Sequence, residues 1–115
     1  MLVFPLKKQW YEKIKSGEKT IEYREVKSYW IKRFYNIIQQ HNFINGYAAC
    51  DFKPWTPVDV IIFKIPMNCF LQLGYNPDTR LQAKITKIEI VNGKNTDLAI
   101  DKPVYAIHLT DVKEV

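Results

Sequence analysis

The feature that most constrains the fold is the run of residues 80–91, in which apolar side chains alternate and then change phase. The apolar positions fall into two sets, Leu81, Ala83 and Ile85 in one phase and Ile88 and Ile90 in the other. Alternation predicts a β-strand with one buried face. The change of phase predicts a β-bulge near Thr86 or Lys87, and bulges bend strands at the corners of barrels. This run therefore predicts a curved sheet.

Shorter segments elsewhere have the period of a strand or a helix. Strands are predicted at 2–6, 19–26, 58–65 and 104–110, and helices at about 8–16 and 28–40. The 58–65 segment is apolar on both faces, which predicts a central strand. A turn is predicted at Gly74–Asp78, because glycine, asparagine and proline cluster there, and a long loop at 41–57.

The order of these elements predicts the fold class. Strands outnumber helices, and no helix separates the last three strands. This order predicts an α+β fold, a mixed and partly closed β-barrel with two packed helices. The chain has 115 residues, and two separate domains of that total length would each be too small to bury an adequate core. We therefore expect a single domain, 1–115.

The positive charge of the chain is unevenly distributed. The net charge is +5, and residues 1–40 hold nine Lys or Arg against four Glu, whereas the remaining residues hold eight of each sign. The whole excess lies in the first third of the chain, where a polyanion such as RNA would be attracted. Two solvated helices with lysine-rich outer faces explain the same pattern, so charge alone does not decide between them.

Several classes of protein are not indicated. No apolar run approaches the roughly 20 residues that span a bilayer. The apolar stretch at residues 1–6 is too short for the apolar region of a signal peptide. We therefore expect a cytoplasmic protein without a membrane partner. Cys50 and Cys69 are isolated and are expected to be buried thiols. No motif for a metal or another cofactor is found, and the sequence does not indicate an oligomeric state.

The segment Gly17–Arg24 holds the residues best suited to chemistry. Glu22 and Arg24 share one face of the predicted strand, about 7 Å apart, as an acceptor and a planar donor for a base edge or a phosphate. Lys19 points the other way unless the chain bends after Gly17; if it converges with Glu22, the two can transfer protons. The alternative is an exposed charged face, whose salt bridge contributes little to stability. On that strand Ile21 and Tyr23 would form the apolar face.

Aromatic residues make up 14% of the chain, and some of them are candidates for stacking on bases. Most aromatic residues at helical or strand spacing belong to the core. Trp55, in the predicted loop, is the best candidate for a ligand contact, because a loop tryptophan has fewer structural roles. Tyr75, in the predicted turn after Gly74, is the second candidate.

The segment Trp10–Gly17 followed by Gly17–Arg24 resembles the opening of ASCH domains, whose signature is Gly-x-Lys-x-x-Glu-x-Arg. Gly17, Lys19, Glu22 and Arg24 match its four fixed positions. Three later segments also resemble this family, the Gly74-Tyr75 turn, the strand at 85–90 and the closing strand at 105–109. The similarity covers nearly the whole chain. It implies a PUA-like barrel with a cleft beside the signature strand.

The resemblance also implies a function, an RNA- or nucleotide-binding domain in which Lys19, Glu22, Arg24, Trp55 and Tyr75 contact the ligand. The alternative is a small amidohydrolase, because one bacterial branch with a similar fold hydrolyses N4-acetylcytidine with a Lys, a Thr and a Glu. Its Lys corresponds to Lys19. Its Thr falls at Glu22, and its Glu has no counterpart here. In an enzyme, Lys19 and Glu22 would be the catalytic pair.

Overall fold

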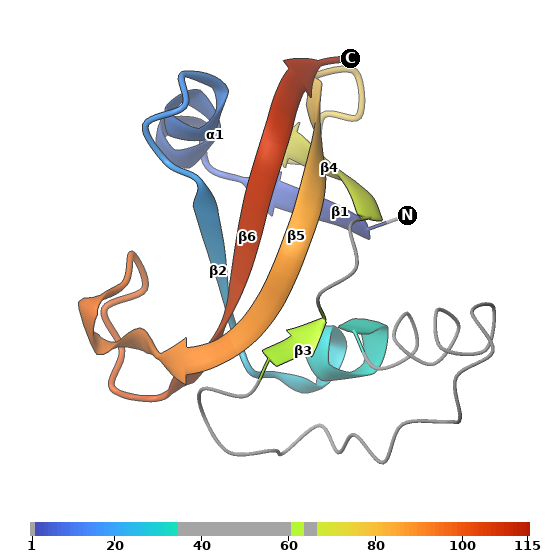
Figure 1. The fold of residues 1–115 in the computed structure, drawn as a ribbon. Helices are drawn as coiled ribbons and strands as arrows, with labels where there is room; N and C mark the ends of the chain where they lie inside the picture. Colours follow the sequence, from blue (N-terminus) through green and yellow to red (C-terminus); the bar gives the residue numbers. More distant parts are fainter. Residues whose placement is uncertain (1, 35–60, 64–66) are drawn as a thin grey trace, which may run out of the picture. The chain divides into compact units, whose positions relative to one another are not determined.

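The computed structural model describes residues 2–34, 61–63 and 67–115. The elements shown in Figure 1 are β1 (Leu2–Leu6), α1 (Lys8–Lys15), β2 (Ile21–Glu25), β3 (Ile61–Phe63), β4 (Met67–Leu73), β5 (Arg80–Asn92), the 3-10 turn η1 (Gly93–Asn95) and β6 (Pro103–Glu114). Residues 28–34 are also helical. The predicted loop 41–57 and the second half of the predicted 28–40 helix lie outside the described residues.

The strands form one mixed sheet. Its order is β1-β4-β5-β6-β2, and β3 pairs with β5 off this path. β1 runs parallel to β4, whereas β4 and β3 are antiparallel to β5. The fold is therefore α+β, with a half-barrel sheet and two helices, as the order of elements predicts. No described helix is long and apolar enough to cross a membrane.

The contacts of the chain cluster into two compact units. The first comprises Met1–Glu22, Lys64–Lys87 and Ile107–Val115, and the second comprises Tyr23–Phe63 and Ile88–Ala106. Buried apolar side chains occur in both units.

The core of the first unit joins β1, α1, β4 and parts of β5 and β6. Along β1, Leu2, Phe4 and Leu6 are buried and alternate with half-buried residues. Pro5 is tolerated because β1 is at the edge of the sheet, where it pairs only with β4 among the described strands. The helix α1 adds Tyr11 and Ile14 to the buried side chains. Burying side chains of this size contributes roughly 1.5–3 kcal/mol each.

The core of the second unit is rich in aromatic side chains. From the 28–34 helix, Trp30 and Phe34 are buried at four-residue spacing, on one helix face. Phe34 meets Tyr105 of β6 edge to face, with ring centroids 4.7 Å apart. Apolar residues of β5 and β6 complete this core, namely Ile88, Ile90, Val104 and Ala106.

The predicted change of phase in β5 is confirmed. The burial alternates through Leu81, Ala83 and Ile85 and resumes at Ile88 and Ile90. At the same place the strand changes partner, because residues 80–85 pair with β4 whereas residues 88 and 89 pair with β3.

The strand β4 was not predicted, although it pairs on both sides, with β1 and with β5. The strand predicted at 58–65 is described only at residues 61–63, where β3 pairs with β5. Its other residues lie outside the described ranges.

Candidate functional site

The turn after α1 determines where Lys19 lies. Gly17 has a φ of +86°, which glycine adopts readily and other residues rarely do. Its amide donates to the Ile14 carbonyl at 3.1 Å, and the Lys19 amide donates to the Lys13 carbonyl at 3.0 Å. The chain therefore folds back against the last turn of the helix before β2 begins. This is the bend that the sequence analysis required if Lys19 was to approach Glu22.

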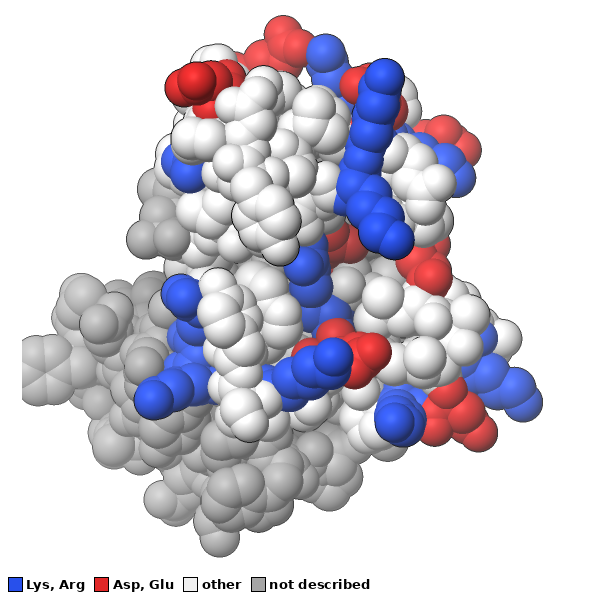
Figure 2. Space-filling model, turned by 180° about the vertical axis from the view of Figure 1, so that it is seen from behind, with Lys and Arg blue, Asp and Glu red and all other residues white. Residues whose placement is uncertain are grey.

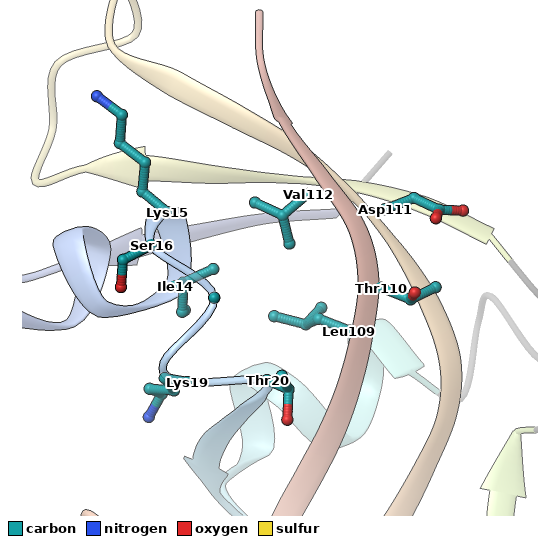
Figure 3. Close-up of a pocket in the computed structure, with 10 residues that line it drawn as sticks. Ile14, Lys15, Ser16, Lys19, Thr20, Leu109, Thr110, Asp111 and Val112 are labelled. Atoms are coloured by element: carbon teal, nitrogen blue, oxygen red, sulfur yellow. The ribbon is translucent and has the colours of Figure 1, made fainter.

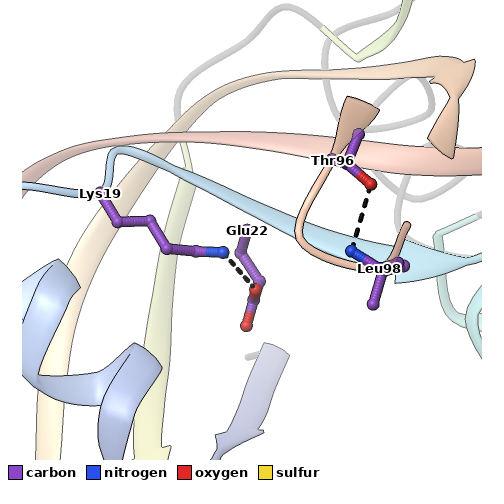
Figure 4. A network of polar contacts seen from close by, with 4 residues as sticks. All are labelled: Lys19, Glu22, Thr96 and Leu98. Atoms are coloured by element: carbon purple, nitrogen blue, oxygen red, sulfur yellow. Dashed lines mark hydrogen bonds and ion pairs between the residues drawn. The ribbon is translucent and has the colours of Figure 1, made fainter. Parts of the chain in front are cut away.

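Lys19 and Glu22 form an ion pair that is nearly closed to solvent. The Lys19 Nζ atom lies 3.4 Å from Glu22 Oε1, and the side chains are 9% and 6% exposed (Figure 4). The Lys19 amine also lies 4.8 Å from the centroid of the Trp10 ring, within the range of a cation–π contact. The structure thus brings together the two residues proposed as a catalytic pair, beside an aromatic ring.

The burial of Glu22 corrects the predicted strand face. Among the five residues of β2 only Glu22 is buried, whereas Ile21 and Tyr23 are half-buried. The predicted apolar face is therefore not the most buried one. Acidic side chains are rarely buried unless they are paired, and Lys19 provides the compensating charge. The alternative of an exposed charged face is also wrong for this pair.

The separation of Lys19 and Glu22 bears on how a ligand would interact with the pair. Charge-assisted hydrogen bonds between an amine and a carboxylate are typically about 2.7–2.9 Å long, so the 3.4 Å separation of Lys19 and Glu22 is loose. A ligand that offers an amino group to the carboxylate can therefore compete with Lys19. The same pair, protected from water, can also transfer a proton to or from a bound molecule.

Arg24 belongs to the second unit and lies against an aromatic ring. Its guanidinium carbon is 5.3 Å from the centroid of the Trp30 ring, and the residue is half-buried. The planar guanidinium suits both stacking on a ring and bidentate contact with a phosphate. Arg24 is therefore held by packing near the start of the 28–34 helix.

Of the two residues predicted to stack on a ligand, Tyr75 is described and Trp55 is not. Tyr75 lies in the turn between β4 and β5, is 92% exposed, and its side chain makes no hydrogen bond or ring contact within the described part of the chain. It does not contact the Lys19–Glu22 pair. Trp55 lies outside the described residues. The structure thus joins Lys19 with Glu22 but does not add Tyr75 to them.

A pocket of about 310 Å³ lies beside the Gly17 turn, in the first unit. The end of α1, the turn and β6 line it, and Figure 3 shows the side chains of Ile14, Leu109 and Val112 at its centre. Lys19 is among the lining residues, and its amine points away from Leu109 and Val112 in this view.

Exposed basic side chains occur in both units. Eight of them form no ion pair with a described residue: Lys7, Lys8, Lys13 and Lys113 in the first unit, and Lys32, Arg33, Lys94 and Lys102 in the second. Lys15 and Lys27, by contrast, pair with Glu114 and Glu25. On the face shown in Figure 2, basic side chains project among acidic and uncharged ones. Within the described ranges, no group of three or more His, Cys, Asp and Glu side chains forms a candidate metal site.

The chain was compared with models of protein families, with curated proteins and with solved structures, and nothing matches.

Proposed function

We propose that this chain is an ASCH-type domain that binds RNA or a nucleotide at the segment Gly17–Arg24. The observation that carries the proposal is the convergence of Lys19 and Glu22 at 3.4 Å, because these are two of the four signature positions. Removing two charges from water costs free energy, and an apolar pair of the same volume is often equally stable or more stable. A functional role for this pair explains why charged residues occupy these positions.

The roles follow from the chemistry of the side chains. The Glu22 carboxylate accepts hydrogen bonds from an exocyclic amino group, as acidic side chains do with cytosine. Lys19 neutralises the carboxylate in the absence of ligand and contacts the ligand when the pair opens. Arg24 donates to a phosphate or a base edge, and the exposed lysines attract the polyanion without specifying its sequence.

Fluorescence anisotropy with short labelled RNAs tests this proposal. We expect binding that weakens as salt is raised, with a slope of about 0.7 per phosphate contacted by the protein. The combined variant Lys19→Ala/Arg24→Ala is expected to bind at least about tenfold more weakly, since charged contacts are worth roughly 1.5–3 kcal/mol each. Lys113→Ala, which removes an exposed lysine of β6, is the control. Circular dichroism shows whether each variant is folded.

Two results would contradict the proposal. The first is binding that does not depend on salt. The second is an affinity of the folded double variant equal to that of the wild-type protein.

A second candidate function is supported by the same pair. Lys19 and Glu22 are shielded from solvent and lie 3.4 Å apart, a contact that would tighten when substrate binds, so a small amidohydrolase acting on an N4-acylated cytidine is the second proposal. In this reaction water adds to the acyl carbon, and the amide bond breaks to give a carboxylate and the free amine of cytidine. Incubation with N4-acetylcytidine is expected to show turnover that is lost in Glu22→Ala. Turnover no greater than that of the variant removes this candidate.

A further inference from the structure

The 28–34 helix has two faces of different character. Trp30 and Phe34 are buried at four-residue spacing. Tyr29, Lys32 and Arg33 are all exposed, and their spacing of three and four residues places them together on the other face. The helix therefore presents one aromatic ring and two cations to solvent.

Tyr29 and Arg33 form a cation–π contact. The Arg33 guanidinium carbon lies 4.1 Å from the centroid of the Tyr29 ring, and Tyr29 is 55% exposed. Both groups are planar and polarisable, and RNA bases stack on aromatic rings and on arginine planes alike. The pair thus presents a flat surface of the kind that a splayed-out base covers.

The Tyr29 ring is connected to buried rings. The Tyr29 ring meets Trp30 edge to face at 4.8 Å, and Trp30 stacks on Phe34 at 5.5 Å. Phe34 in turn meets the buried Tyr105 of β6. A chain of ring contacts therefore links the exposed tyrosine to the core, so little conformational freedom is lost when a base stacks on it.

The surroundings are positively charged. Lys32 and Arg33 are both exposed, and neither forms an ion pair with a described residue. The signature residue Arg24 contacts the same aromatic cluster, through the Trp30 ring at 5.3 Å. Two cations thus flank two rings, in the order Arg24, Trp30, Tyr29, Arg33.

We propose that Tyr29 and Arg33 form a stacking platform for one unpaired base of a single-stranded RNA, with Lys32 contacting a neighbouring phosphate. The inference rests on the proposed function and assigns it a second contact point, outside the Gly17–Arg24 signature. Single-stranded RNA is the partner because the bases of a duplex are already stacked within it and are not available to a side chain.

The test is a titration of the whole chain with a short single-stranded RNA that contains 2-aminopurine, whose fluorescence falls when it stacks on an aromatic ring. We expect quenching on binding. Tyr29→Leu, which keeps an apolar side chain without the ring, is expected to bind about tenfold more weakly, within the range measured for base–aromatic stacking. Tyr29→Phe is expected to bind within twofold of wild type.

Arg33→Lys tests the contribution of the planar guanidinium alone, because lysine keeps the positive charge but has no planar group. It is expected to weaken binding at least threefold, whereas the exposed Lys94→Ala, which removes a charge in η1, is expected to have an effect below twofold. All these side chains are exposed, and circular dichroism checks that the variants are folded.

The outcomes distinguish the platform from the proposed function. If Tyr29→Leu and Arg33→Lys bind as wild type does while Lys19→Ala/Arg24→Ala does not, the platform is wrong and the proposed function stands. If wild-type protein binds no RNA, both are wrong. If Tyr29→Leu and Arg33→Lys lose affinity and quenching together, the platform is supported.

Discussion

Neutralising one partner of the Lys19–Glu22 pair is expected to destabilise the protein strongly. In Glu22→Gln, the Lys19 cation stays beside a neutral amide in a site where both side chains are more than nine-tenths buried. In Lys19→Met, the Glu22 carboxylate loses the Lys19 cation. Each single variant therefore removes one charge of the buried pair and leaves the other, whereas the double variant removes both.

The magnitude follows from the separation of the two charges. At 3.4 Å and an effective dielectric constant of about 20, two unit charges attract each other by roughly 5 kcal/mol. Desolvation of both groups offsets part of this attraction, and breaking buried pairs typically costs about 3–5 kcal/mol. We expect a loss of about 3 kcal/mol for each single variant. The double variant is expected to lose about 3 kcal/mol as well, rather than the sum of about 6.

Urea unfolding followed by tryptophan fluorescence and by circular dichroism measures these differences. Coincident transitions in the two signals show that a single free energy of unfolding is defined. Losses below about 1 kcal/mol in each single variant, adding up in the double variant, would show that the pair behaves like an exposed salt bridge. That result would refute the reasoning from burial.

Three further predictions concern stability and reactivity. Gly17→Ala places an alanine at a φ of +86°, where no atom lies within 4 Å of the new Cβ, so the cost is that of the backbone conformation alone. We expect the free energy of unfolding in urea to fall by about 1–2 kcal/mol. An unchanged unfolding midpoint would contradict the role of the turn. Burial raises the pKa of the Cys69 thiol to about 12, so in a Cys50→Ser background iodoacetamide at pH 8 should react roughly 1,000-fold faster after unfolding; equal rates would contradict this. Burial also raises the pKa of Tyr105 to about 12. Its unfolded pKa is about 10, so the unfolded state loses this proton first and stability falls between pH 10 and 12; Tyr105→Phe should reduce that fall, and identical pH profiles would contradict it.

The main features of the fold can be read from local patterns. The change of phase between Ile85 and Ile88 is visible because alternation is a property of neighbouring residues, and it marks the place where β5 changes partner. β4 was not predicted, although Met67, Cys69, Leu71 and Leu73 alternate. Its pairing with β1 joins residues more than 60 positions apart, which no local pattern indicates.

The candidate site was predictable in part. The residue types at Lys19, Glu22 and Arg24 were selected from the sequence, but the direction of Lys19 depends on the hydrogen bond between its amide and the Lys13 carbonyl. The burial of Glu22 could not be predicted from alternation, because a charged residue on a strand is usually exposed. The Tyr29–Arg33 contact had a detectable signal, four-residue spacing on a predicted helix, which the sequence analysis did not use.

The central claim is that the segment Gly17–Arg24 binds RNA, and nuclear magnetic resonance tests it most directly. A short single-stranded RNA is added to 15N-labelled protein, and the amide signals of this segment and the indole signal of Trp10 are followed. We predict saturable shifts of Lys19, Glu22, Arg24 and the Trp10 indole, because the ligand opens the ion pair beside that ring. Saturable shifts confined to other residues, or no shifts at millimolar RNA, would contradict the claim.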